Sequence, residues 1–271
     1  MDKREYSFYF VGTPIGNFDE MTFRAVEVLK NVDEIWCEDT KHSLPLLTHF
    51  DIRKPLESFH KFSDNSKIDL LIEKLKSGKK IAYISDAGMP CISDPGLKLS
   101  RALIDNDFCY TVVSGASACL NALLLSGLDT ENFCFVGFLK EKNKEKQEQI
   151  DKIKNLHCTL IFYSSVHNVK KDLQFLQNQL GDRKCAVVRE LTKLFEEVER
   201  GHLSEIQLET IKGEYVICVE GKTQNQSEMS VEDYLKNQLE FLDSKEAIKE
   251  TAKKFNLQKN IVYQMYVEMK I

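Results

Sequence analysis

The stretch IAYISDAGMPCISDPGLKLSRALIDNDFCYTVVSG, residues 81–115, decides the fold. It opens on IAYIS, an apolar run with the length of a buried strand, and it closes on a second such run, YTVVS. Between the two lies GLKLSRALIDND, which has the pattern of a helix. A strand, a helix and a strand in this order are typical of a parallel sheet.

The same alternation continues on both sides of this stretch. Upstream, strands are expected at FYFVG (8–12) and EIWCED (34–39), and helices at residues 23–32 and 68–80. Downstream, the very apolar helix ASACLNALLLSGL (116–128) opens a second series. Its further strands are expected at residues 133–138, 159–165, 185–191 and 214–221, and its further helices at residues 140–155 and 169–181.

The sequence therefore predicts an α/β fold with two consecutive α/β domains, residues 1–115 and 116–225. Residues 226–271 are polar and helix-forming, and we expect a small helical appendage there. Two short helices, joined by a turn at Phe255 and Asn256, would take the shape of a helix-turn-helix. Six of their residues are expected to face inward: Ala247, Thr251, Ala252, Ile261, Val262 and Tyr266.

Composition and charge limit the classes of function. The 271 residues carry a formal net charge of −5, so an RNA partner would need a local basic face. The eight cysteines are scattered without a C-x-x-C pair, and we expect neither a metal site nor a disulfide. The N-terminus lacks the apolar region of a signal peptide, and no apolar run reaches about 18 residues. These features predict a cytoplasmic protein with no membrane segment.

Four unusual loops follow predicted strands, at the edge where ligands bind in open α/β sheets. They are GTPIGN (12–17), EDTKH (38–42), SDAGMPCISDPG (85–96) and RELTKLFEEVERG (189–201). The first is neither a dinucleotide fingerprint nor a P-loop, and it fits either a tight turn or a ligand held against bare backbone. The third, rich in glycine and proline, can present several backbone groups to a flat polar ligand such as adenosine.

The two charged loops each allow two interpretations. In EDTKH, the side chains of Asp39, Lys41 and His42 either hold or deprotonate a substrate, or they lie in a solvated loop in which Asp39 caps the next turn. In RELTKLFEEVERG, the charged side chains belong either to a functional site or to a network of ion pairs on the surface.

Five segments, in this order and spacing, resemble the small-subunit ribosomal RNA methyltransferase I family of the tetrapyrrole-methylase-like (class III) methyltransferases: GTPIGNFDEMTFRA, EDTKHSLPLL, SDAGMPCISDPG, RELTK-x-x-EE-x-x-RG and KGEYV. The similarity covers roughly residues 5–222. It implies two α/β domains with S-adenosylmethionine in the cleft between them, no metal, and a homodimer. It also implies 2′-O-methylation of a cytidine ribose in the decoding region of 16S ribosomal RNA, so the partner would be that RNA or the 30S subunit.

The resemblance further implies the cofactor-binding residues, which are Pro14, Asp86, Ala87, Gly88, Met89, Ile92, Ser117, Ala118, Ser164 and Leu191. The chain departs from the family pattern most clearly at FYSSVHNV (162–169), where the family reads F-Y-E-S-P-H-R. Ser164 there takes the place of an acid, and His167 is retained.

Methyl transfer to a ribose hydroxyl needs in-line alignment and help for a poor nucleophile, from a base or from a cation. Asp39 and His42 are the candidate bases, with Lys41 or Lys193 as the cation and Glu190 as a weaker candidate base. Basic side chains available to hold RNA are Arg24, Lys41, Arg53, Lys54, Lys61, Lys142, Lys144, Lys146 and Lys193.

Two alternatives stay open. A tetrapyrrole C-methyltransferase on the same fold would bind the same cofactor beside a large apolar cleft. A non-catalytic relative that binds RNA or the ribosome would keep the fold without binding the cofactor.

Overall fold

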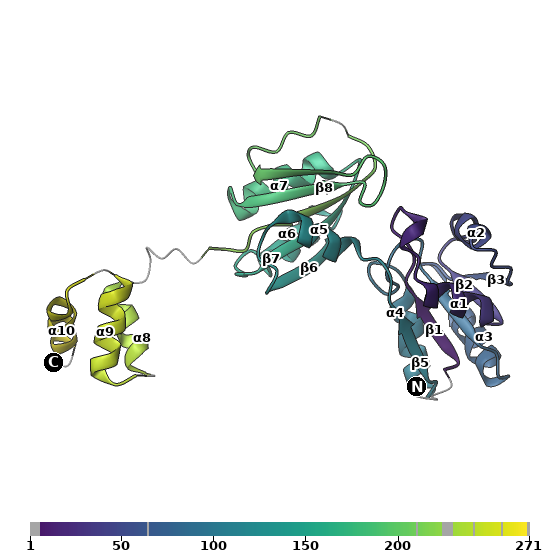
Figure 1. Cartoon of the computed structure of the whole chain (residues 1–271), viewed down its shortest axis with the longest axis horizontal. Helices are drawn as coiled ribbons and strands as arrows, with labels where there is room; N and C mark the ends of the chain where they lie inside the picture. The colour runs from purple at the N-terminus through teal and green to yellow at the C-terminus, as the bar shows by residue number, and fades with distance from the viewer. Residues whose placement is uncertain are drawn as a thin grey trace. The chain divides into compact units, whose positions relative to one another are not determined.

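The computed structural model describes residues 6–63, 65–209, 211–223, 230–240, 242–255 and 257–269. Its internal contacts divide the chain into two compact units, Met1–Lys222 and Thr223–Ile271 (Figure 1). The first unit contains two five-stranded sheets, one for each predicted α/β domain. The predicted boundary after residue 225 and the turn residue Asn256 lie outside the described residues.

The first sheet is parallel throughout, in the order β3-β2-β4-β1-β5. Its strands are β1 (Phe8–Val11), β2 (Glu34–Cys37), β3 (Leu56–Ser58), β4 (Ile81–Ile84) and β5 (Tyr110–Val113). Phe8 is in register with both Ile81 and Tyr110, so β1 lies between β4 and β5. Because the strands all run the same way, the loops that follow them gather at one edge of the sheet.

Helices on both faces of this sheet bury its strands. The helices are η1 (Phe18–Glu20), α1 (Phe23–Asn31), α2 (Thr40–His49), α3 (Asn65–Lys76) and α4 (Gly96–Asp105). On one face, Leu29 of α1 and Leu47 of α2 share a buried cluster with Ile84. On the other face, side chains of α3 and α4 share a cluster with the fully buried Trp36. Each fully buried leucine or isoleucine stabilises the fold by about 1.5–3 kcal/mol.

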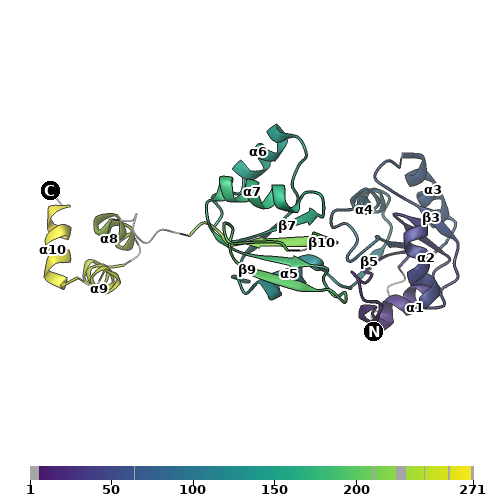
Figure 2. The same cartoon turned by 90° about the horizontal axis from the view of Figure 1, so that it is seen from above.

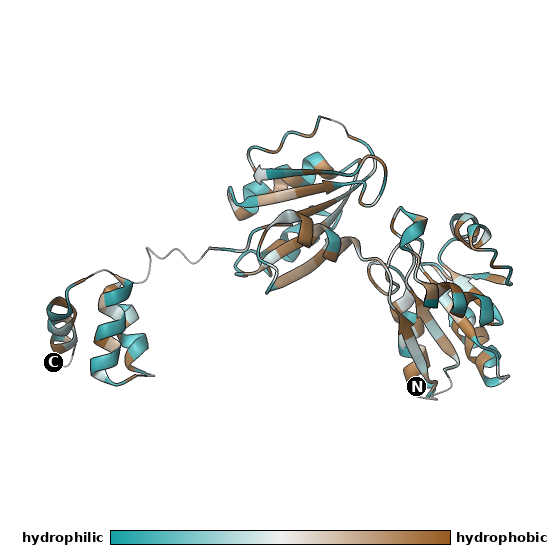
Figure 3. Ribbon diagram, viewed as in Figure 1, coloured by the Kyte–Doolittle hydropathy of each residue, from teal (hydrophilic) through white to brown (hydrophobic). Residues whose placement is uncertain are grey.

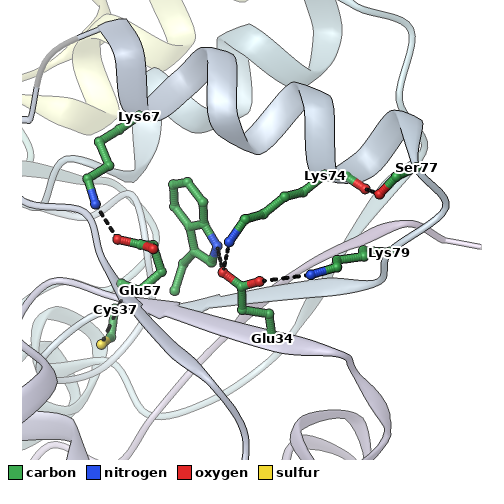
Figure 4. Close-up of polar contacts among 8 residues, drawn as sticks. Glu34, Cys37, Glu57, Lys67, Lys74, Ser77 and Lys79 are labelled. Atoms are coloured by element: carbon green, nitrogen blue, oxygen red, sulfur yellow. Dashed lines mark hydrogen bonds and ion pairs between the residues drawn. The ribbon is translucent and has the colours of Figure 1, made fainter.

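A buried carboxylate holds the amino end of β2. Glu34, 4% exposed, accepts a hydrogen bond from Trp36 Nε1 at 3.1 Å and pairs with the ammonium groups of Lys74 and Lys79 (Figure 4). Lys74 extends from α3 across the strand, so the ion pair ties the helix to the sheet. This charged cluster lies at the end of β2 opposite to the EDTKH loop.

The second domain begins with α5 (Ala118–Ser126), which ends at Gly127 with a φ of 72°, the usual glycine cap. The second sheet has the order β6-β7-β10-β8-β9, and only its β6–β7 pair is parallel. The remaining elements are β6 (Phe133–Phe138), α6 (Asn143–Asp151), β7 (Thr159–Ser165), α7 (Val169–Leu180), β8 (Lys184–Arg189), β9 (Glu197–His202) and β10 (Glu214–Val219).

This domain is α/β as predicted, but its sheet is mixed. The segment EVERGH, which the sequence analysis assigned to a charged loop, forms the edge strand β9. An edge strand can carry charged side chains that face solvent, so the apolar residues that mark a strand in the sequence are few. Helices α6 and α7 cover one face of the sheet and α5 the other (Figure 2). Apolar residues accordingly concentrate on the strands and along α5 (Figure 3).

The C-terminal unit is a small bundle of α8 (Val231–Leu239), α9 (Ser244–Lys254) and α10 (Lys259–Glu268). Its core joins Leu235 of α8 to residues of α9 and α10. Five of the six residues expected to face inward lie in or against this core or are otherwise buried, but Ile261 is 39% exposed. The sequence analysis expected two helices in this segment and did not predict α8, because the apolar and polar residues of α8 form only a moderately amphipathic pattern.

Candidate active site

A pocket of about 290 Å³ is lined by loops of the first sheet and by the second domain. Its walls combine apolar side chains, such as Ile15 and Leu191, with the carboxyl groups of Glu38, Asp86 and Asp94. The loops after β1, β2, β4 and β8 all contribute, and so does the junction between the two domains. The structure thus brings together four loops that are far apart in the sequence.

The glycines of GTPIGN allow close approach between chain segments. A Cβ built on Gly12 would lie 2.7 Å from Gly115 Cα, and one built on Gly16 would lie 2.5 Å from Lys193 Cγ. Because it has no side chain, Gly12 can contact Gly115 at the domain junction. For the same reason, Gly16 can contact the RELTK loop. Any larger residue would force these segments apart.

The rest of this loop is fixed to the third loop. The N–H of Thr13 donates to the carbonyl of Gly88 at 2.9 Å, and its side chain is buried. Ile15 lines the pocket, whereas Pro14 is buried outside the lining. The loop thus places one apolar side chain at the pocket, and its glycines serve packing.

The loop SDAGMPCISDPG forms the largest part of the wall. Gly88 has a φ of 78°, and a Cβ there would lie 3.2 Å from the carbonyl oxygen of Ala116. Met89 accepts a hydrogen bond from the N–H of Gly115 at its sulfur, at 3.2 Å. Both residues therefore join the loop to the domain junction as well as to the pocket.

Asp94 gives this wall a partly buried carboxyl group whose pKa is raised. Burial raises the pKa of its carboxyl group, although backbone N–H groups such as that of Gly96 oppose the shift. Oδ1 accepts from the Gly96 N–H at 2.6 Å. Hydrogen bonds from the N–H groups of Cys91 and Ile92 and from the Tyr83 hydroxyl also oppose the shift.

The EDTKH loop lies at the edge of the pocket. Glu38 lines it, and burial, followed by the nearby charges of Asp86 and Asp94, raises the pKa of the Glu38 carboxyl group. Asp39 is the N-cap of α2: its Oδ1 accepts from the N–H of Lys41 at 2.8 Å. The Asp39 N–H in turn donates to Asp86 Oδ1 at 3.2 Å.

Asp39, Lys41 and His42 are all exposed, and none of them is part of the pocket lining. Asp39 serves as a helix cap, one of the two interpretations that the sequence allowed. Glu38, which the sequence analysis did not select, is the acid of this loop that reaches the pocket. The available signal was the position of Glu38 directly after the fully buried strand β2, at the edge where ligands bind in parallel sheets.

The RELTK loop contributes an ion-pair cluster. Lys193 Nζ donates to Glu190 Oε1 at 2.8 Å and to Glu214 Oε2 at 3.1 Å. Partial burial disfavours the ammonium ion, but the hydrogen bonds to the two carboxylates outweigh it and raise the pKa of Lys193. Glu214 lines the pocket, so Lys193 borders it through this carboxylate.

Nine of the ten predicted cofactor-binding residues line the pocket, and Pro14 does not. Their role in binding stays a prediction. The lining residues that the sequence analysis missed are Ile15, Glu38, Ser85, Ser93, Asp94, Phe138, Tyr163, Ser165, Glu214, Tyr215 and Val216. Several of these lie on strand ends of the second sheet, whose place in the pocket depends on how the two domains meet.

All eight thiols are free, and burial raises the pKa of Cys91, beside the pocket, to about 12. Within the described ranges, no group of three or more His, Cys, Asp or Glu side chains is arranged to hold a metal ion. In the same part of the chain, no helix is both long and apolar enough to cross a membrane.

Comparison with known proteins gives a consistent result. Residues 7–207 match the family described as Tetrapyrrole (Corrin/Porphyrin) Methylases. The chain is 39% identical to "Ribosomal RNA small subunit methyltransferase I" of Bacillus subtilis, over 95% of this chain and 93% of that protein. It is 40% identical to the protein of the same name from Streptococcus pyogenes serotype M18, over 98% of this chain and 96% of that protein.

A solved structure supports the fold alone. The uroporphyrin-III-C-methyltransferase from Thermus thermophilus superposes with a TM-score of 0.56 at 17% sequence identity. The match covers 79% of this chain and 93% of that one.

Proposed function

Since this chain belongs to the ribosomal RNA small subunit methyltransferase I family, within the tetrapyrrole methylases, we propose that it methylates the ribose 2′-hydroxyl of a cytidine in the decoding region of small-subunit ribosomal RNA. The methyl donor is S-adenosylmethionine. The observation that supports this most strongly is the single pocket in which residues from four motif loops meet. The reaction would take place in the cytoplasm, where its RNA substrate is made and assembled.

The residues of the pocket fit this cofactor. S-adenosylmethionine supplies a methyl group on a positively charged sulfonium, beside an adenosine and an ammonium group. The carboxyl groups of Glu38, Asp86 and Asp94 complement such positive charge. Ile15, Met89 and other apolar residues offer a surface for a flat ring.

The chain's own residues can assist the ribose hydroxyl at the edge formed by EDTKH. We keep Asp39 and His42 as candidate bases, and Glu38 joins them because it lines the pocket and its raised pKa brings it nearer to the ideal for a general base. His42 lies close enough to Glu38 that its positive charge lowers the Glu38 pKa, against the larger effect of burial. Lys193 forms ion pairs with two carboxylates, which largely compensate its positive charge.

The RNA would contact a basic and aromatic surface of the first domain. Phe23 and Phe62 are 98% and 87% exposed, and each is the sequence neighbour of an exposed cation, Arg24 or Lys61. Exposed aromatic rings beside positive charges are typical of proteins that bind unpaired nucleotides. Lys146, in contrast, was wrongly included among the RNA-contacting residues, because it is only 14% exposed and pairs with Asp172.

A homodimer is the proposed assembly. Helix α5 exposes Leu120 and Leu124, which are 46% and 74% exposed and lie one turn apart on the same face. An apolar helix face of this kind is suited to association with a second copy. Light scattering of the wild type and of Leu124→Glu would test it, and a monomeric wild type would refute it.

The decisive experiment is transfer of a tritiated methyl group from S-adenosylmethionine to purified small subunits, followed by mapping of the modified nucleotide. We expect one labelled cytidine, and the phosphodiester bond on its 3′ side should resist alkali because the 2′-oxygen that would attack it is blocked. Glu38→Gln, Asp39→Asn and His42→Ala are compared at saturating cofactor, and the base is the residue whose loss abolishes transfer while cofactor binding persists.

The alternatives give different results in the same experiments. A tetrapyrrole methyltransferase would bind the cofactor but label no RNA. A non-catalytic relative would show no heat of binding with S-adenosylmethionine in calorimetry.

A further inference from the structure

A buried hydrogen bond connects the pocket wall to helix α7. Ser164, at the end of β7, lines the pocket, and its Oγ donates to Asp172 Oδ2 at 2.7 Å. The other carboxylate oxygen of Asp172, Oδ1, accepts from Lys146 Nζ at 2.8 Å. Ser164 is 3% exposed and Asp172 is 6% exposed, so water has little access to either group.

Three elements fix this arrangement. Asp172 lies in the first turn of α7, where a negative charge interacts favourably with the helix dipole, and its N–H donates to the carbonyl of Asn168 at 2.8 Å. Lys146 comes from α6, and its ammonium group lies 4.4 Å from the centre of the Phe175 ring. The cation is thus held in place on one side by the ring and on the other by the carboxylate.

The hydrogen bond determines what Ser164 can offer to a ligand. A serine hydroxyl has one proton to donate and two lone pairs to accept with. Because the proton is committed to Asp172, only acceptor capacity remains on Oγ. Lys146 pairs with Asp172 Oδ1 and so helps to hold the carboxylate in this orientation.

We propose that Asp172 is a positioning residue of the cofactor site, which holds Ser164 as a hydrogen-bond acceptor for a donor group of the cofactor. The inference rests on the proposed function, since it assumes that S-adenosylmethionine occupies this pocket. Lys146 supports Asp172 and has no contact with the ligand in this proposal.

The test is calorimetric titration of the full-length protein with S-adenosylmethionine, together with thermal melts without ligand. Ser164→Ala keeps the Lys146–Asp172 pair and should fold, while its affinity should fall roughly tenfold, the loss expected for one hydrogen bond to a charged or polarised partner. Asp172→Ser should show a similar loss. Lys152→Met, which removes an exposed lysine at the end of α6, is the charge control and should bind as the wild type does.

The double variant Ser164→Glu/Asp172→Ser gives the sharpest comparison. It exchanges the hydroxyl and the carboxylate between positions 164 and 172, so an acceptor again lines the pocket and the two groups can still pair. It should therefore bind within about threefold of the wild type although Asp172→Ser alone does not. A purely structural role would lower the melting temperature of the single variants and leave their affinities unchanged.

Three results would overturn the proposal. They are wild-type affinity in Ser164→Ala, a double variant that binds no better than folded Asp172→Ser, and a loss of affinity in Lys152→Met as large as in the single variants. If Asp172→Ser does not fold, Ser164→Ala and the double variant decide. A wild type that does not bind S-adenosylmethionine would refute the proposed function itself, which is a separate outcome.

Discussion

Gly12 and Gly115 approach so closely that a Cβ on Gly12 would lie 2.7 Å from the Cα and from the nitrogen of Gly115. One glycine ends the first strand, and the other opens the junction between the two domains. This contact fixes the position of the first loop relative to the domain that closes the pocket. The first position of GTPIGN is a glycine because its backbone packs directly against the backbone of Gly115.

We expect Gly12→Ala to lower the free energy of unfolding by about 1–3 kcal/mol, since one methyl group must push two backbone segments apart. Urea denaturation measures this. Ser114→Ala, an exposed neighbour of the same junction, is the control and should change stability by less than about 0.5 kcal/mol. Equal stability of Gly12→Ala and the wild type would show that the junction relaxes freely.

Glu34→Gln should destabilise the protein without affecting the cofactor. Glu34 is 4% exposed and pairs with Lys74, whose side chain is 20% exposed, so removal of the charge leaves a partly buried cation unpaired (Figure 4). We expect a loss of about 1.5–3 kcal/mol in urea denaturation. The affinity for S-adenosylmethionine should be unchanged, because the pair lies at the amino end of β2 and Glu38 at its carboxyl end.

Lys79→Met is the matched comparison for this cluster. The Lys79 side chain is 47% exposed and its nitrogen lies 3.6 Å from Glu34 Oε2. A pair this accessible to water contributes about 0–1 kcal/mol. A larger effect for Lys79→Met than for Glu34→Gln would contradict the description of Glu34 as the centre of the cluster.

The thiols should react in an order set by burial. Burial raises the pKa of Cys37 to about 11 and that of Cys185 to about 12, so almost no thiolate is present at neutral pH. Cys109 is exposed. Iodoacetamide at pH 7.5, followed by mass spectrometry of peptides, should label Cys109 first. Early modification of Cys185 in the folded protein would show that the second sheet opens readily.

RNA binding should depend on exposed aromatic rings and on salt. Phe62→Ala should weaken binding to small-subunit RNA about fivefold or more, as expected for loss of one stacked base at about 1–3 kcal/mol. Because the ring is 87% exposed, the melting temperature should not change. Filter binding at increasing salt should show a steep linear fall of log affinity with log salt for both proteins. Leu156→Ala, at a partly exposed apolar position of the second domain, serves as the control.

The pH dependence of cofactor binding should follow Glu38 and Asp94. Burial raises the pKa of both carboxyl groups, so the folded protein binds these two protons more tightly than the unfolded chain does. Their contribution to the free energy of unfolding is therefore most favourable at low pH and falls as the pH rises through the raised values. The affinity for a cationic cofactor should change in the opposite direction, since the ionised carboxylates attract it.

Calorimetry at pH 5 and at pH 8 should show weaker binding at the lower pH. In Glu38→Gln this difference should become smaller, because one of the titrating groups is gone. Melting temperatures without ligand, compared between the two proteins at each pH, isolate the stability contribution of Glu38. An equal pH dependence of binding in both proteins would assign the effect to other groups.

The amino-acid sequence by itself determined the α/β class, because its strands are short apolar runs and its helices are separated from them by glycine and charged residues. It also predicted that the loops after β1, β2 and β4 gather together, since parallel strands bring the loops at their carboxyl ends to one edge of the sheet. The residues of SDAGMPCISDPG could thus be selected from their position in the chain alone.

Only the tertiary structure decided which side chains of those loops face the pocket. Asp39 and Glu38 are neighbours in the sequence, yet the first caps α2 and the second lines the pocket, because successive residues after a strand point in different directions. The same holds for Asp172: nothing in its local pattern marks it, and it acquires a role only because the turn into α7 places its carboxylate against Ser164.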